Sequence, residues 1–385
     1  MEVVVIMTHN KPEKLIRLSK SCIGSAEKMA VMGVLDREFL GMGAEVQQFE
    51  QALTAFFGRP AICVVNGTAA LHLAIQACGI GLGDEVLVPS LTYLASFQAI
   101  SATGAKPVAC DVNPETCVLD WSDAERRLTS RTKAVMPVHY SGGVGDLENI
   151  YTFANRHGLR VIEDAAHAFG TTYHGKRIGG FGDLVCFSFD GIKNITSGEG
   201  GCIVTDDPGA LRRIQDARLL GIEKDTEKRY TQQRSWEFDV ANQGWRYHMS
   251  NIMAAIGLEQ LNRFSEISSI RQRLAKCYDK LLLIHPRIQP LPRDYTTVAP
   301  HIYVVRIKDL SDRRALQAQL LERGIQTGIH YQPNHEISFY HDPTALPLPV
   351  TEALFPELLT LPLHPDISEK DVEFICGNLK ALLHD

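Results

Sequence analysis

Short apolar segments alternate with helix-like segments from about residue 60 to 220, and this alternation constrains the fold most strongly. Nearly every position of the apolar segments is hydrophobic, which predicts strands buried on both faces. Such strands, separated by helices, form a mostly parallel sheet covered by helices, so we predict an α/β fold. The expected strands are 61–65, 85–88, 107–110, 134–138, 159–162 and 185–189, and the expected helices are 69–78, 94–103, 120–128 and 146–157.

A second, smaller unit is expected at the C-terminal end. Residues 250–283 have helical periodicity, and four prolines follow within a short stretch. We therefore predict a large α/β domain at 1–283, including an N-terminal arm, and a small α+β domain at 284–385. Its expected elements are a strand at 301–307, a helix at 313–323, a strand at 326–330 and a helix at 369–383.

The composition excludes several classes of protein. A net charge of −6 argues against a nucleic-acid partner, and no apolar run is long enough to cross a membrane. The apolar run at 3–7 is shorter than the core of a secretory signal, so we expect a cytoplasmic protein. The nine cysteines are scattered singly, which argues against disulfides and against a zinc or other metal site.

The segment Asn66-Gly67-Thr68 follows an expected strand and opens an expected helix. A helix N-terminus presents unpaired N–H groups, Gly67 allows close approach, and the Thr68 hydroxyl adds a donor, so this turn suits a phosphate. The alternative is that Thr68 only caps the helix.

Two carboxylates, Glu163 and Asp164, end a buried strand. Ligands of α/β folds bind at such strand ends, where Asp164 can pair with the pyridinium nitrogen of a cofactor. Adjacent strand residues point to opposite faces, so Glu163 has a separate role, such as a salt bridge elsewhere.

Lys193 lies just after another buried strand, on a loop rich in Ser, Thr and Gly. Desolvation there lowers the pKa of the amine, as a nucleophilic lysine requires. An exposed loop lysine is the alternative, but the phosphate turn, an aromatic residue and the strand-end Asp precede Lys193 in order and favour the catalytic interpretation.

With these residues, the chain resembles the DegT/DnrJ/EryC1/StrS family of sugar-nucleotide aminotransferases, which are fold type I pyridoxal-phosphate enzymes. The resemblance extends from about Ile16 to the end of the chain. It rests on segments in the family's order: NGTAALHL at 66–73, GDEV at 83–86, PSLTY at 89–93, EDAAHA at 163–168 and SGEGG at 197–201.

The resemblance implies pyridoxal 5′-phosphate as cofactor and a role for each matching residue. Lys193 would bond to the cofactor and move protons, Asp164 would bind the pyridine nitrogen, and Tyr93 would stack on the ring. The phosphate would be held by Gly67, Thr68 and Ser188. His167 stands where the family often has Gln and would donate near the phenolic oxygen. The residues implied near the substrate are His330 and Tyr331.

One segment departs from the family pattern. The usual G-x-N-Y-R-M is GWRYHM here, at 244–249, so Arg246 replaces an Asn that reaches the neighbouring subunit's cofactor phosphate in relatives. Arginine can bind phosphate with two hydrogen bonds and a full charge. We therefore expect a homodimer with shared sites; the alternative is a surface ion pair of Arg246.

The resemblance implies transfer of an amino group from glutamate to a keto sugar on a nucleotide diphosphate, for glycans such as lipopolysaccharide. The segment TSGEGG at 196–201 resembles the corresponding segment of family members that aminate C-4 of a 4-keto-6-deoxyhexose. Amination at C-3 of a 3-keto sugar is the alternative. A dehydratase of this fold would carry His in place of Lys193. A non-catalytic regulator would have lost Lys193, Asp164 or the phosphate turn, and none of these is lost here. A nicotinamide oxidoreductase would need the pattern G-x-G-x-x-G after a strand, which the segment GIGLG at 79–83 does not match.

Overall fold

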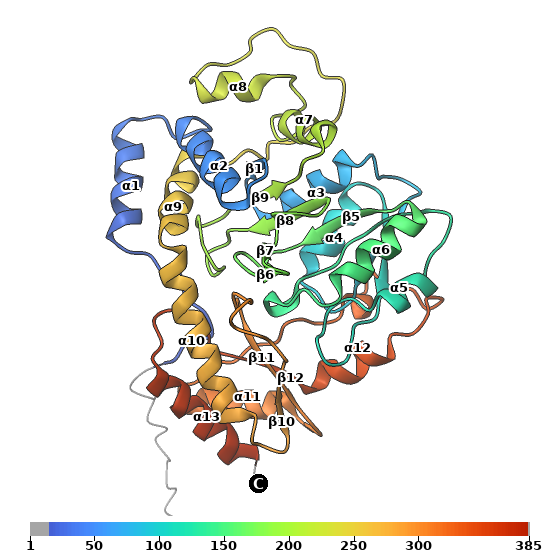
Figure 1. Cartoon of the computed structure of the whole chain (residues 1–385), viewed down its shortest axis with the longest axis vertical. Coiled ribbons are helices and arrows are strands. Elements are labelled where there is room, and N and C mark those ends of the chain that lie inside the picture. Colours follow the sequence, from blue (N-terminus) through green and yellow to red (C-terminus); the bar gives the residue numbers. More distant parts are fainter. Residues whose placement is uncertain (1–14, 384–385) are drawn as a thin grey trace, which may run out of the picture.

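A seven-stranded sheet forms the centre of the larger part of the protein. The structure is a computed structural model that describes residues 15–383, so the apolar run at 3–7 lies outside the described residues. The strand order is β1-β9-β8-β5-β4-β2-β3. The strands are β1 (Ala61–Val64), β2 (Glu85–Pro89), β3 (Lys106–Cys110), β4 (Thr132–Val135), β5 (Arg160–Asp164), β8 (Leu184–Ser188) and β9 (Gly201–Val204). The predicted α/β fold is confirmed (Figure 1).

Strand β9 is an element that the sequence analysis did not predict. It runs antiparallel to both of its neighbours, β1 and β8, whereas β3, β2, β4, β5 and β8 are parallel. Because β9 returns beside β8, the loop between these two strands is held at the carboxyl end of β8. This loop carries Lys193.

Helices cover both faces of this sheet, as the nearly continuous apolar strands predict. Side chains of β1 alternate between the two cores: Ile62 and Val64 pack with α3, α4 and α7, while Ala61 and Cys63 pack with α2. The helices are α2 (Ala44–Phe57), α3 (Gly67–Ala77), α4 (Leu94–Ala102), α5 (Trp121–Arg126), α6 (Leu147–His157) and α7 (Pro208–Ala217).

A three-stranded antiparallel sheet with its own core forms the C-terminal part. It comprises β10 (Ile288–Pro290), β11 (Tyr303–Ile307) and β12 (Leu358–Leu361), packed against α10 (Phe264–Leu282), α11 (Arg313–Glu322) and α13 (Glu369–Leu383). Figure 1 shows α10 extending from the level of the large sheet to the small one. Helix α10 lies before residue 283, yet it contributes Leu274, Tyr278 and Leu282 to the C-terminal core. A domain boundary after residue 283 therefore remains a prediction.

The prediction of a strand at 326–330 is wrong. Two isolated bridges occur instead: Ile325 pairs with Ile16, and Gly328 pairs with Thr360. The chain changes partner between these positions, so no continuous ladder forms. It then carries His330 and Tyr331 into the wall of a cavity.

The remaining elements flank these two sheets. They are α1 (Ser25–Asp36), α8 (Asp225–Tyr230), α9 (Asn251–Asn262), α12 (Pro349–Leu354) and the short hairpin of β6 (Thr172–Tyr173) and β7 (Lys176–Arg177). Within residues 15–383, no helix combines the length and the apolar character that crossing a membrane requires.

Candidate active site

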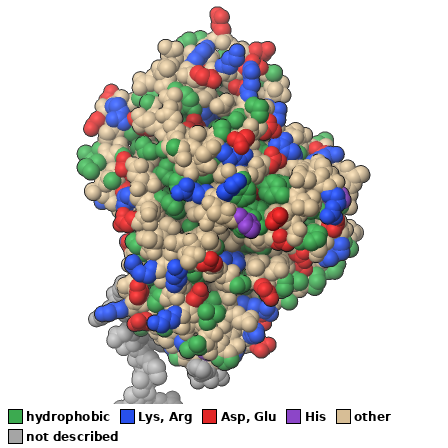
Figure 2. All heavy atoms as spheres, in the orientation of Figure 1, with side chains coloured by type: hydrophobic (Ala, Val, Ile, Leu, Met, Phe, Trp, Pro, Cys, Tyr) green, Lys and Arg blue, Asp and Glu red, His purple; other side chains and the backbone are tan. Residues whose placement is uncertain are grey.

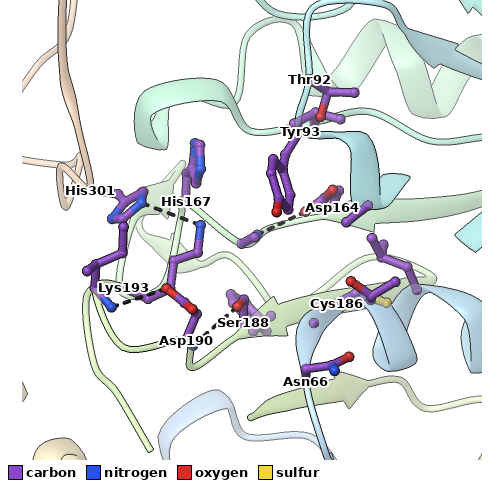
Figure 3. Close-up of a pocket in the computed structure, with 18 of the residues that line it drawn as sticks. Asn66, Thr92, Tyr93, Asp164, His167, Cys186, Ser188, Asp190, Lys193 and His301 are labelled. Atoms are coloured by element: carbon purple, nitrogen blue, oxygen red, sulfur yellow. Dashed lines mark hydrogen bonds between the residues drawn. The ribbon is translucent and has the colours of Figure 1, made fainter. Parts of the chain in front are cut away.

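A cavity of about 460 Å³ lies at the carboxyl ends of β5 and β8 and collects nearly all of the predicted site residues. Figure 3 shows side chains from several elements pointing into it. The predicted residues that line it are Gly67, Thr68, Tyr93, Asp164, His167, Ser188, Lys193, His330 and Tyr331. The exception is Arg246, which is exposed and lies outside the cavity.

The start of α3 forms one corner of the cavity. Asn66 is the N-cap, and its side chain accepts a hydrogen bond from the Ala69 N–H at 2.8 Å. Thr68 is therefore not the cap, and the first-turn N–H groups of Gly67 and Thr68 have no partner within the helix. A Cβ at Gly67 would lie 2.8 Å from Cβ of Ser188, so only glycine fits between α3 and β8. This corner suits a small anion.

Asp164, the last residue of β5, is buried and points toward the cavity. Its Oδ2 accepts a hydrogen bond from the Ser96 hydroxyl at 2.7 Å, and its Oδ1 accepts one from the Ala166 N–H at 3.2 Å. The neighbouring Glu163 is held elsewhere, since Tyr151 donates to its Oε1 at 2.5 Å and His139 lies 2.7 Å from its Oε2. Only one of the two strand-end carboxylates therefore serves the cavity.

Lys193 lies half-buried on the loop between β8 and β9. Burial lowers the pKa of its amine to about 8, although the nearby carboxylates of Asp164 and Asp190 act in the opposite direction. A lysine with this pKa is partly uncharged near neutral pH, and the uncharged amine is the nucleophile. Its Nζ lies 3.4 Å from Nε2 of His301.

Three histidines with lowered pKa values, His167, His301 and His330, lie near this amine in the cavity wall. Nδ1 of His167 accepts from the Ser141 N–H at 3.4 Å, so Nε2 carries the proton and donates to the Tyr331 hydroxyl at 2.9 Å. Burial, followed by the charge of Lys193, holds the pKa of His167 well below its usual value. The same causes lower the pKa of His330 to about 4, and Nδ1 of His330 lies 2.8 Å from the Thr360 hydroxyl.

Two residues of the cavity region were missed by the sequence analysis. His301 was considered only as the start of a strand, yet its ring lies 4.5 Å from that of His167, in the cavity wall. No local signal identifies it, because it is remote from Lys193 in the sequence. Ser96, in the first turn of α4, orients Asp164, and its hydroxyl lies 3.0 Å from that of Thr92. The Thr92-x-x-x-Ser96 spacing was a weak signal for this pair.

Arg246 occupies a different surface. Its backbone forms a bridge with Leu219, and its guanidinium makes no hydrogen bond or ion pair within residues 15–383. A surface ion pair within the described chain is therefore not its role.

The comparisons with known proteins agree with this geometry. The model of the DegT/DnrJ/EryC1/StrS aminotransferase family matches residues 21–380. The chain belongs to this family. Among solved structures, the aminotransferase TlmJ from Streptoalloteichus hindustanus is 32% identical with a TM-score of 0.89, covering 96% of this chain and 99% of TlmJ.

Two further structures extend the comparison to other organisms. PseC of Helicobacter pylori, an aminotransferase involved in the biosynthesis of pseudoaminic acid, is 26% identical with a TM-score of 0.89, covering 96% of this chain and 100% of PseC. Spr1654 from Streptococcus pneumoniae in its PMP-form is 29% identical with a TM-score of 0.89, covering 96% of this chain and 98% of Spr1654.

The DegT/DnrJ/EryC1/StrS aminotransferases use pyridoxal phosphate, so this chain is a pyridoxal-phosphate-dependent sugar aminotransferase. The residues present fit this cofactor on three observations. The glycine-only corner at Gly67 can receive a phosphate, Asp164 presents a buried carboxylate, and Lys193 presents an amine with a lowered pKa.

Proposed function

We propose that the protein transfers the amino group of glutamate to the keto carbon of a sugar linked to a nucleotide diphosphate. The observation that carries this proposal is that the Lys193 amine and the Asp164 carboxylate line one cavity. Asp164 ends β5, and Lys193 lies on the loop that follows the adjacent parallel strand β8. Family membership supports the choice of a sugar as amino acceptor.

The chain offers a residue for each part of the cofactor. Asp164 would bind the pyridine nitrogen and Lys193 the aldehyde carbon, and Tyr93 would pack against the ring. The phosphate would be held by the turn at the start of α3, formed by Gly67 and Thr68, together with Ser188. His167 and Tyr331 form a hydrogen-bonded pair whose remaining tyrosine proton is available to an oxygen in the cavity.

Pyridoxal phosphate, when bound, supplies a ring that accepts the electron pair released when a C–H bond beside the amino group breaks. Lys193 would take that proton and return it, a function that suits a pKa of about 8. Glutamate and the sugar would use the same cavity in turn. Overall, the amino group and the carbonyl oxygen exchange between the two substrates, so no external oxidant is needed.

Charge balance supports a second subunit at the site. Among the described residues that line the cavity, Lys193 is the only lysine or arginine, whereas Asp164, Asp190 and Glu199 are carboxylates. A cofactor phosphate and a nucleotide diphosphate need additional positive charge. We propose a homodimer in which Arg246 of the partner subunit provides it.

An apolar surface on α1 suits such a dimer. Met29, Met32 and Leu35 of this helix are 65%, 61% and 48% exposed. Figure 2 shows hydrophobic side chains along the edge of the molecule where α1 lies. Exposed methionine and leucine side chains on one helix are typical of a surface that a second copy covers.

We propose C-4 of a 4-keto-6-deoxyhexose as the carbon that receives nitrogen. The segment 196–201 begins three residues after Lys193 and leads into β9, and Glu199 from this segment lines the cavity. Residues there can determine which sugar carbon comes within reach of the amine. The second candidate is C-3 of a 3-keto sugar, since Arg246 in place of the family's Asn can re-aim the sugar in the cavity.

The test is an assay of purified protein with glutamate and a panel of nucleotide-linked 3-keto and 4-keto sugars, with the aminated carbon assigned by NMR. We expect product with the amine at C-4. Amination at C-3 with an inert 4-keto isomer would overturn the regiochemistry, and no product from any keto sugar would overturn the proposed function. A cytoplasmic location and a role in glycan or lipopolysaccharide synthesis remain predictions.

A further inference from the structure

His301 is a buried histidine whose ring reaches the reactive lysine. Its Nε2 lies 3.4 Å from Nζ of Lys193, and Figure 3 shows this contact as a dashed line. The other ring nitrogen, Nδ1, is buried and has no hydrogen-bond partner among residues 15–383. Buried polar groups are nearly always hydrogen-bonded, so the contact with Lys193 is the polar interaction that accounts for a histidine at this position.

Buried side chains fix the distance between these two residues. Arg271 donates through Nη1 to the His301 carbonyl at 3.0 Å and through Nη2 to the Ile192 carbonyl at 3.4 Å. Asn194 donates to the Ala299 carbonyl at 3.0 Å. The main chain on both sides of Lys193 is therefore tied to the main chain beside His301.

The imidazole of His301 is uncharged. Burial, followed by the positive charge of Lys193 and, more weakly, that of Arg271, holds its pKa well below the usual value. Asp164 and Asp190 are the carboxylates that face Lys193 in the same cavity. His301 thus offers the amine a hydrogen-bond acceptor without adding a negative charge.

We propose that His301 is a positioning residue of the reactive lysine. Its buried imidazole accepts a hydrogen bond from the Lys193 amine and holds that amine toward the cavity whenever it is not bonded to the cofactor. This inference rests on the proposed function, since it concerns the lysine that binds pyridoxal phosphate. It assigns to the segment before β11 a part in returning Lys193 to the cofactor.

Two amide variants separate positioning from packing. In His301→Gln the side-chain amide reaches the place of Nε2 and can still contact Lys193. In His301→Asn the amide takes the place of Nδ1, which contacts no described residue. His301→Leu removes the polar group altogether. Thermal unfolding of each variant checks that it remains folded. If the Leu variant does not fold, the comparison of the Asn variant with the Gln variant still tests the inference.

Full-length protein without cofactor is mixed with pyridoxal phosphate over a range of pH, and samples are reduced with borohydride at successive times. Label on the Lys193 peptide is then quantified. At high pH, where the amine is uncharged, we expect His301→Asn and His301→Leu to acquire label about tenfold more slowly than wild type, and His301→Gln within about twofold. If His301→Asn acquired label at the same rate as wild type, or at the same rate as His301→Gln, the inference would be overturned. Label on a different lysine in wild-type protein would instead overturn the proposed function.

Discussion

At the scale of single residues, both carboxylate oxygens of Asp164 accept a hydrogen bond. Ser96 and the Ala166 N–H hold the group in one orientation at the end of β5. A carboxylate fixed in this way can meet a ring nitrogen without reorganising, which is the main source of electrostatic catalysis. The proposed role therefore depends on the charge of Asp164 more than on its shape.

We predict that Asp164→Asn folds normally but loses turnover. The Ser96 hydroxyl can rotate to accept from the new amide, so stability should change by about 1 kcal/mol or less. Turnover with glutamate should fall about 10²–10³-fold, because the ring nitrogen loses its charged partner. Steady-state kinetics of cofactor-loaded protein test this, with Ser96→Ala as a milder control. Turnover near the wild-type value would place the ring's partner elsewhere.

Lys193 should make the stability of cofactor-free protein depend on pH. Folding lowers its pKa from 10.5 to about 8. Below pH 8 both states carry the proton, and the buried charge destabilises the folded state fully. Between about 8 and 10.5 the unfolded state binds more protons, so stability rises with pH.

Lys193→Met removes this charge and should stabilise cofactor-free protein by up to about 3 kcal/mol at pH 7. The difference from wild type should disappear as pH rises toward 10.5. Urea unfolding at a series of pH values measures it. A stability difference independent of pH would show that the amine titrates normally in the folded protein.

At the scale of elements, a buried charge network joins α2, α7 and α8. Arg218, at the end of α7, is fully buried and donates to Glu50 of α2 and to Tyr230 of α8. The Arg218 carbonyl also accepts from the Tyr247 N–H at 3.0 Å, next to Arg246. This network therefore places the segment that we propose to reach the partner's site.

Replacing Arg218 by Met should destabilise the protein by about 3–5 kcal/mol, because Glu50 is left buried without its cation. Glu50→Gln in the same background should restore part of that loss. Chemical denaturation of the three proteins measures both effects. A loss below about 1 kcal/mol would show that water or another group compensates Glu50.

The elements that could be predicted from sequence are those with a strong local pattern. Strand β8 is apolar except for its last residue, and β5 has an apolar centre at Val161 and Ile162, so both were located to within a few residues. β9 was missed because it is short and begins at Gly201, within a glycine-rich segment. Pairing between distant segments likewise determined the outcome at 326–330, where Ile325 and Gly328 bond to different partners. His301 reaches the site through such long-range packing, which no single stretch of sequence encodes.

At the scale of the whole molecule, the exposed guanidinium of Arg246 and the cavity with few cations suggest that two subunits build each site. Inactive Lys193→Ala and weakened Arg246→Ala proteins, when mixed, should form heterodimers that contain one site with both residues intact. We expect recovery of up to about half the wild-type activity per heterodimer, since one of two sites is complete. Proven heterodimers without recovered activity would contradict a contact between subunits.

The most direct test of the aminotransferase site is borohydride reduction of the cofactor-loaded protein, followed by peptide mapping. Lys193 is the lysine that lines the cavity. We predict a yellow protein whose colour is lost on reduction and whose label lies on the Lys193 peptide alone. Label on any other lysine, or none on cofactor-loaded protein, would contradict the assignment of Lys193 as the residue that holds pyridoxal phosphate.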